Sequence, residues 1–359
     1  MMRYGNGNAA GFVSPGGYDG WVRLQRACRR LPGAKWRSPA LCALALLLLL
    51  PFAGPIPALA APGWQGAGKL PAEFSAPRAA LLPDGRVLAV SASAAAVYTM
   101  ATDTWVTPGA LPFDATGAEL IVLAGGQALL AGGVVNNFAT NPFAPPQQVA
   151  RFDPATNSWT KRGEMQIGRS GHTMTALANG QILVVGGGVR GLSPRQPQRT
   201  ANEVELYNPA TEVWSKVAPL AQARLSHTAT RLADGRVLVV GGRVSKIVNS
   251  EFGGYDTLAG AEIYDPSANS WQPAAPMSQA RSGHTAALLH DGTVLVVGGD
   301  SGGSLTAERY DPAKGSWSAA GTLRAYWLGG VSATVLPNGA VLVAGGRSEN
   351  DASVKFAQI

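Results

Sequence analysis

One spacing recurs along almost the whole chain and restricts what the chain can fold into. Glycines that follow a short polar turn recur six times, at Gly85, Gly126, Gly180, Gly235, Gly292 and Gly339. Tryptophans recur in step with them, at Trp64, Trp105, Trp159, Trp214, Trp271 and Trp317. Each tryptophan precedes the next of these glycines by 21 residues, except in the last pair, where the separation is 22. A fixed period of this kind indicates repeated structural units that bury their apolar surfaces against one another.

Each unit has the composition of short antiparallel strands. Runs such as Val237–Val240 and Val294–Val297 are apolar, β-branched and bounded by glycines, which predicts buried strands. Asp-Gly or Asn-Gly pairs precede most of these runs, and we expect type I′ hairpins there, with positive φ at both central residues. A third strand carries an aromatic residue seven positions before the next tryptophan; these aromatic residues are Tyr98, Phe152, Tyr207, Tyr264 and Tyr310. The chain is therefore predicted to be all-β.

The second strand of most units ends in a diglycine, such as Gly186-Gly187 or Gly298-Gly299. Diglycine, aromatic residue and tryptophan at these distances resemble the kelch repeat, and the resemblance covers roughly residues 62–359. It implies a six-bladed kelch β-propeller in which each repeat is one four-stranded blade. Unit 1 departs from the pattern with Ser91-Ala92 in place of the diglycine, and unit 6 lacks a tryptophan strand. The blades are expected at residues 77–105, 116–159, 169–214, 224–271, 281–317, and 324–359 together with 62–70.

The two ends of this region complement each other. The chain stops three residues after Phe356, so the last unit has no fourth strand of its own, and Trp64 stands where a tryptophan strand belongs. We expect the Trp64 segment to complete the last blade, because this pairing closes the ring and covers the last sheet edge. Residues 61–359 then form one propeller domain, and we expect no second domain after it.

Residues 1–60 have the anatomy of a secretory signal peptide. Residues 23–37 are basic, Leu41–Leu50 is apolar, and Ala58-Leu59-Ala60 is an A-x-A cleavage site. The prolines at 51, 55 and 57 interrupt the apolar run, which favours a cleaved leader over the alternative, an uncleaved membrane anchor. We therefore expect an exported protein that is periplasmic, secreted or displayed on the cell surface.

The charge of the chain belongs mostly to this leader. The formal net charge is +7, but residues 1–60 hold seven Lys and Arg against one Asp, which leaves 22 basic and 21 acidic residues in the remainder. A nearly neutral propeller argues against nucleic-acid binding. Both cysteines, Cys28 and Cys42, lie in the leader, so the mature protein is expected to have neither disulfides nor thiol chemistry.

The connections between strands 2 and 3 vary in length, unlike the other spacings. They are long in three neighbouring blades, at residues 134–148, 188–202 and 243–260. In a four-stranded antiparallel blade these loops lie on the same face as the connections between blades. Binding groups often lie on variable loops held by a rigid scaffold, so we expect function on this face. The alternative is neutral insertion, which surface loops tolerate.

Polar residues recur in the connections between blades. Blades 3, 4 and 5 each have an arginine ten residues after the tryptophan and a histidine three residues later: Arg169 and His172, Arg224 and His227, Arg281 and His284. Together with other side chains of this face they form the predicted ligand-binding set, completed by Arg190, Arg195, Lys246, Phe252, Tyr255, Arg324, Tyr326 and Trp327. The arginines suit carboxylates or acidic sugars, and the aromatic residues suit sugar rings or peptide side chains. The alternatives are salt bridges within a blade and loop packing.

The three histidines raise the question of a metal site, since imidazole binds zinc and copper. A repeated residue more often makes the same local hydrogen bond in every blade, so we expect no metal and no cofactor. The resemblance implies a non-catalytic scaffold for a protein, peptide or glycan, and we expect a monomer that contacts a membrane only through an uncleaved leader. The alternative is a carbohydrate-active enzyme similar to sialate epimerases. A copper oxidase similar to galactose oxidase is disfavoured, because the cross-linked cysteine it needs is missing.

Overall fold

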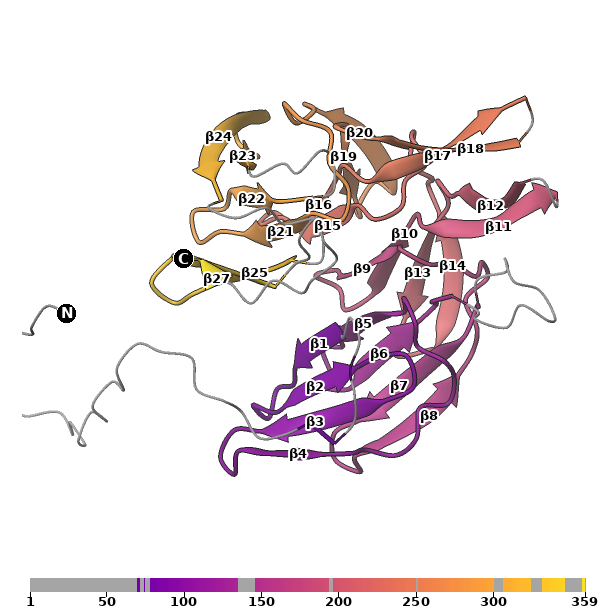
Figure 1. Ribbon diagram of the computed structural model, residues 1–359, viewed down its shortest axis with the longest axis vertical. Helices are drawn as coiled ribbons and strands as arrows, with labels where there is room; N and C mark the ends of the chain where they lie inside the picture. Colours follow the sequence, from indigo (N-terminus) through magenta and orange to yellow (C-terminus); the bar gives the residue numbers. More distant parts are fainter. Residues whose placement is uncertain are drawn as a thin grey trace, which may run out of the picture. The chain divides into compact units, whose positions relative to one another are not determined.

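The fold is taken from a computed structural model that describes residues 70–71, 74, 78–134, 146–193, 196–249, 251–299, 306–323, 331–345 and 357–358. These residues belong to one compact unit, Gly66–Ile359. All regular secondary structure among them is β-strand, as predicted (Figure 1). None of the described segments is a helix that is long and apolar enough to cross a membrane.

Five four-stranded antiparallel sheets follow one another along the chain. The first contains β1 (Arg78–Leu81), β2 (Val87–Val90), β3 (Ala95–Thr99) and β4 (Thr104–Val106). The second contains β5 (Glu119–Val122), β6 (Ala128–Ala131), β7 (Val149–Asp153) and β8 (Ser158–Arg162). The third contains β9 (Thr173–Ala176), β10 (Ile182–Val185), β13 (Val204–Asn208) and β14 (Val213–Val217). The fourth contains β15 (Thr228–Arg231), β16 (Val237–Val240), β19 (Ala261–Asp265) and β20 (Ser270–Ala274). The fifth contains β21 (Thr285–Leu288), β22 (Val294–Val297), β23 (Thr306–Asp311) and β24 (Ser316–Thr322).

A sixth sheet is smaller. It contains β25 (Val331–Val335), β26 (Val341–Gly345) and the short β27 (Ala357–Gln358). The described residues thus form five complete blades, where the sequence predicted six. The Trp64 segment, which was expected to complete the last blade, lies outside the described residues.

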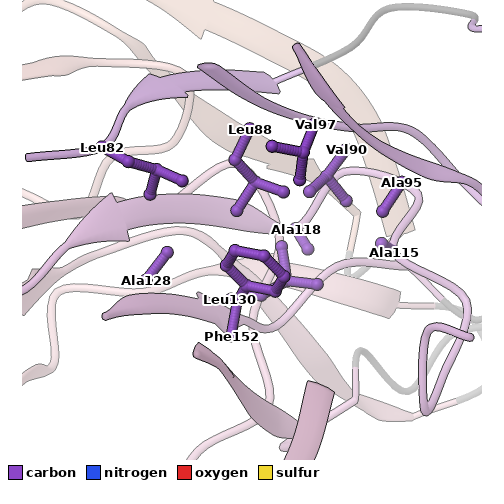
Figure 2. Packing of buried hydrophobic residues seen from close by; sticks show 10 residues of the cluster. All are labelled: Leu82, Leu88, Val90, Ala95, Val97, Ala115, Ala118, Ala128, Leu130 and Phe152. Carbon is purple, nitrogen blue, oxygen red and sulfur yellow. The ribbon is translucent and has the colours of Figure 1, made fainter. Parts of the chain in front are cut away.

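Neighbouring sheets pack in chain order. The first strand of each of the first five sheets contacts the first strand of the sheet that follows it. Apolar residues fill the space between sheets: Leu88 and Val97 of the first sheet pack with Leu130 and Phe152 of the second, all with no exposed surface (Figure 2). Similar clusters join the second sheet to the third, the third to the fourth and the fourth to the fifth. Each blade therefore depends on its neighbours for its core, as stacked repeats do.

The hairpins that join strands 1 and 2 differ from the predicted type I′ turn. Gly85 has φ 83°, but Asp84 is not among the residues with positive φ. The Gly85 amide donates to the Leu82 carbonyl, and the Leu82 amide donates to the Arg86 carbonyl. This is the three-residue loop in which a type I turn precedes a left-handed glycine. The aspartate is explained by its carboxylate, which accepts a hydrogen bond from the Arg86 amide at 3.0 Å.

The seven-residue spacing between the third-strand aromatic residue and the tryptophan brings their two rings together in every complete blade. The third-strand aromatic residue lies directly across from the fourth-strand tryptophan, as in Tyr207 and Trp214, whose ring centroids are 4.7 Å apart. The other four pairs have centroids 5.0 to 5.2 Å apart. Seven residues are the length needed to leave one strand, make the turn and return to the opposite position. Such tilted aromatic pairs stabilise a sheet beyond their burial alone.

Candidate binding face

Three arginines of the predicted ligand set lie inside the blades. Arg169, Arg224 and Arg281 are each at most 1% exposed. Each forms an ion pair with a glutamate on the third strand of its own blade: Arg169 with Glu205 at 2.7 Å, Arg224 with Glu262 at 2.8 Å, and Arg281 with Glu308 at 2.8 Å. Of the two roles considered for these arginines, the structure shows the salt bridge within a blade.

The same arginines also tie neighbouring blades together. The Arg224 guanidinium donates to the carbonyl of Gly241, the first glycine of its own blade's diglycine, at 2.8 Å. The Arg224 carbonyl accepts a hydrogen bond at 2.9 Å from the amide of Gly187, in the preceding blade. Arg281 repeats both bonds, with Gly298 and Gly242 as its partners. The diglycine of one blade and the arginine of the next are therefore hydrogen-bonded to each other, and we call this contact between neighbouring blades the joint.

The histidines are part of this joint. His227 lies 3.0 Å from the Thr173 hydroxyl of the preceding blade, through its Nε2 atom, and His284 lies 2.9 Å from the Thr228 hydroxyl in the same way. Burial lowers the pKa of His172 and of His284 to about 3, and the nearby arginine adds to the effect. Burial also holds the pKa of His227 well below its usual range. These imidazoles are thus neutral at physiological pH, and the described residues bring no three His, Cys, Asp or Glu side chains together as a metal site.

The joint changes where blades 1 and 2 begin. The residue after the histidine is Thr173, Thr228 or Thr285 in blades 3 to 5, but Arg78 and Glu119 occupy the same position in blades 1 and 2. The Arg78 Nη2 and Glu119 Oε1 atoms are 2.5 Å apart, which joins the first strands of these two blades. Neither ring nitrogen of His172 has a hydrogen-bond partner among the described residues. We did not predict Arg78 or Glu119; the break in the repeat at this position is the signal that identifies them.

Glu119 is expected to make stability depend on pH. Burial raises the pKa of Glu119 to about 7, against the opposing effect of Arg78. A carboxyl whose pKa is higher in the folded than in the unfolded protein contributes stability at low pH, and this contribution is lost as pH rises through about 7. Glu119→Gln should therefore unfold like the wild type near pH 4 and be more stable at pH 8, by up to about 3 kcal/mol.

Urea unfolding of both proteins between pH 4 and pH 9 measures this difference. Glu164→Gln is the matched control, because Glu164 is exposed and pairs loosely with Lys161 at 3.9 Å. A Glu119→Gln variant that is less stable than the wild type at pH 8 would mean that the pair with Arg78 outweighs the burial of the carboxylate.

The long loops of blades 3 and 4 form hairpins of their own. β11 (Gly188–Ser193) pairs with β12 (Gln196–Thr200), and β17 (Arg243–Val248) pairs with β18 (Glu251–Thr257) (Figure 1). The two hairpins contact each other through β12. The hydroxyls of Thr200 and Ser245 are 2.9 Å apart, and each residue's amide donates to the other's hydroxyl. These insertions are therefore structured, and the two hairpins are tied to each other.

Three members of the predicted ligand set lie on the β17–β18 hairpin. Arg243 stacks over the Tyr255 ring, with its guanidinium carbon 4.3 Å from the ring centroid. The Tyr255 and Phe252 rings meet edge to face, with centroids 5.0 Å apart. Phe252 is 41% exposed, and Lys246 forms an exposed ion pair with Asp256 at 3.5 Å. An exposed aromatic and charged surface on a fixed hairpin can bind a polypeptide or a sugar.

The other members of the set are placed less fully. Arg190 lies on β11, in a part of the hairpin where the structure describes only the backbone. Four residues lie outside the described residues: Arg195, Arg324, Tyr326 and Trp327. The structure thus divides the predicted set into a buried joint, formed by three arginines and three histidines, and an exposed hairpin that carries Lys246, Phe252 and Tyr255.

Comparison with known proteins agrees with this architecture. The family model for the Attractin/LZTR1 beta-propeller matches residues 138–307. Among curated proteins, Kelch-like protein 35 of Mus musculus is 30% identical over 62% of this chain and 33% of its own length. Kelch-like protein 36 of Bos taurus is 27% identical over 72% of this chain and 40% of its own. The solved structure of YjhT covers 80% of this chain and 94% of its own, with a TM-score of 0.63 and 18% identity.

These likenesses define the class of protein. The chain is a β-propeller built of kelch repeats, a class that typically serves in protein interaction, which supports a binding role. The chain spans 33% of the length of Kelch-like protein 35 and 40% of the length of Kelch-like protein 36. It spans 28% of the length of another relative, Kelch-like protein 25 of Xenopus tropicalis. What those longer proteins do as a whole is therefore not carried over to it.

Proposed function

We propose that this protein is an exported, non-catalytic scaffold that binds a protein, peptide or glycan through the face formed by its strand 2–3 hairpins. The observation that carries this proposal is the pair of hairpins in blades 3 and 4. They are tied together by Thr200 and Ser245, and the second hairpin exposes Ile247 and Phe252, which lie opposite each other, at 45% and 41%. Clustered apolar exposure on an ordered element is typical of an interaction site.

The proposal includes export and closure of the ring. The signal-peptide pattern of residues 1–60 supports export. The spacing of 21 residues from Trp64 to Gly85 supports a fourth strand for the sixth sheet, because the same spacing accompanies a fourth strand in the complete blades. The mass of the exported protein tests export and cleavage: it should begin at Ala61, which retains the Trp64 that closure of the ring requires.

The binding role is tested by shortening both hairpins. Each is cut back to its first residue pair, Gly188 with Thr200 and Arg243 with Thr257, and closed by an Asn-Gly turn. We expect wild-type protein to capture a specific partner from the exported fraction of the producing cell, and the shortened protein to lose it while still folding cooperatively. Capture is measured by cross-linking and mass spectrometry.

The control for this test changes the opposite face. Arg86 and Arg236 lie in strand 1–2 hairpins, where each pairs with the aspartate two residues before it. Replacing both with serine should leave capture unchanged. Capture that survives the loss of both hairpins would contradict the proposed face.

An acidic sugar that is bound and chemically converted would favour the alternative function, a carbohydrate-active enzyme. The observation that supports this alternative is the raised pKa of Glu119 beside Arg78.

A further inference from the structure

β18 pairs with β17 in the second hairpin, and β12 of the first hairpin contacts both strands. The Ser245 amide of β17 donates to the Thr200 hydroxyl of β12 at 2.7 Å, so at this position the edge of β17 faces β12. On its other side β17 pairs with β18. Among the described residues, β17 is the only strand that is hydrogen-bonded to β18. The far edge of β18 is therefore the edge to which another strand can be added.

This edge lacks two of the residue types that commonly protect an outer strand. Outer strands are commonly protected by lysine or proline. In this protein β8, β14 and β20 carry Lys161, Lys216 and Pro273 respectively, whereas β4 and β24 carry neither residue type. The sequence of β18 is Glu-Phe-Gly-Gly-Tyr-Asp-Thr, which contains neither residue type. β18 does carry a bulge against β17, at the register shift between Ser245 and Ile247, and two exposed acidic residues. We therefore expect an extended polypeptide to pair with this edge when its own side chains neutralise the acidic residues.

The two faces of the hairpin have different chemistry. On one face Ile247 lies opposite Phe252, and the Phe252 ring contacts Tyr255, which makes an apolar and aromatic surface. On the other face the charged residues of β18 are Glu251 and Asp256, both acidic and both exposed. Lys246 of β17 reaches Asp256 at 3.5 Å, in a pair whose side chains are 52% and 58% exposed. Such a pair is weak in water, so the negative charge of Asp256 is still available to attract a basic group.

We propose that β18 accepts an extended segment of a partner protein as an added strand, and that this segment alternates apolar with basic side chains. Its apolar side chains would extend the surface of Ile247 and Phe252, and its basic side chains would lie beside Glu251 and Asp256. Cross-strand pairs of these kinds stabilise antiparallel sheets. The inference rests on the proposed function, because it identifies the partner chemistry of the same face.

The same charges disfavour a second copy of this chain as the occupant. If β18 paired with β18 of another molecule in antiparallel register, Glu251 and Asp256 of one strand would lie close to the same acidic residues of the other. Like charges beside each other across strands destabilise the pairing. A foreign strand with basic residues avoids this repulsion.

The experiment uses synthetic peptides of about eight residues, long enough to span β18. The first alternates valine with lysine and threonine, the second carries glutamate in place of lysine, and the third is the first with alternate backbone amides methylated. Binding to the full-length protein is measured by fluorescence anisotropy at low ionic strength. We expect saturable binding of the lysine peptide, no binding of the glutamate peptide, and loss of binding on methylation, because methylated amides cannot pair with the strand edge.

Charge reversal on β18 supplies the decisive comparison. Glu251→Lys combined with Asp256→Lys should lose the lysine peptide and gain the glutamate peptide, and Phe252→Ser should weaken the lysine peptide by about tenfold or more. Glu164→Lys is the matched control, since Glu164 is exposed and follows β8 of the second blade, and this variant should bind like the wild type.

Several outcomes would overturn the inference. They are no binding of the lysine peptide up to about 1 mM, equal binding of the methylated peptide, and equal binding by the charge-reversed protein. A dimer that forms through β18 and is lost on charge reversal would assign the edge to a second copy. If a natural partner is lost on hairpin shortening but retained after charge reversal, the proposed function stands and this inference fails. If the shortened protein keeps its partner, both fail.

Discussion

Replacing Arg224 with methionine is expected to lower the free energy of unfolding by about 3–5 kcal/mol, which is the usual cost of removing one partner of a buried ion pair. Among the described residues, the loss would leave the buried Glu262 carboxylate with the Ala221 and Gln222 amides as its remaining donors. The carbonyls of Gly241 and Gly260 would also lose their guanidinium partner. Urea or guanidinium unfolding, followed by tryptophan fluorescence, measures the change.

An exposed pair provides the comparison for this variant. Arg236 forms an ion pair with Asp234 at 2.7 Å, but its side chain is 35% exposed. Arg236→Met should therefore cost less than about 1 kcal/mol. The double variant Arg224→Met with Glu262→Leu should recover much of the stability that the single variant loses, because no unpaired charge stays buried. Equal losses in the Arg224 and Arg236 variants would mean that the buried pair does not stabilise the joint between blades.

Replacing Gly241 with alanine is expected to cost about 2–5 kcal/mol. The residue has φ 63°, and an added Cβ atom would lie 2.6 Å from the Arg281 carbonyl oxygen and 2.7 Å from the His284 Cε1 atom. A left-handed backbone costs a residue with a side chain roughly 1–2 kcal/mol, and forcing atoms into a filled core adds about 1–3 kcal/mol. Because the Arg281 carbonyl also accepts the Gly242 amide, relief of the clash would weaken the joint between blades 4 and 5.

Gly235→Ala separates backbone strain from crowding. Gly235 has φ 89°, but an added Cβ atom would meet nothing within 4 Å. This variant should cost only the backbone strain, roughly 1–2 kcal/mol. Thermal and urea unfolding of both variants gives the difference, which measures the crowding at the joint. If the two variants are equally stable, the diglycine is needed for its backbone conformation alone.

The sequence determined the architecture of the blades, because the features that specify it are local. The distance between Tyr207 and Trp214 encodes a turn of fixed length, and the structure places the two rings across from each other. The turn type was predicted incorrectly, because an aspartate before a glycine suits two kinds of turn. The Asp84 carboxylate, which accepts the Arg86 amide, accompanies the type I turn that the structure shows.

The tertiary structure decided the roles of the repeated arginines and histidines. Arg224 could equally face a ligand or a neighbouring strand, because a long charged side chain reaches either and its local sequence is the same in both cases. The sequence did contain a signal: blades 3, 4 and 5, which have the arginine, also have a glutamate two residues before the third-strand tyrosine, and blades 1 and 2 have alanine there. Only folding shows that this glutamate, 38 residues after Arg224, lies 2.8 Å from it.

The role of the exposed hairpin could likewise not be predicted from its local sequence. The length of residues 243–260 marked an insertion, and its aromatic residues suggested contacts. Its function as an edge depends on Ser245 bonding to Thr200 in another blade, 45 residues away along the chain. Spacing along a chain specifies which strands form and how each turns into the next. Packing between blades decides which side chains are buried and which strand is left at an edge. The surfaces that pack together are far apart in the sequence, so a local sequence pattern does not predict their contact.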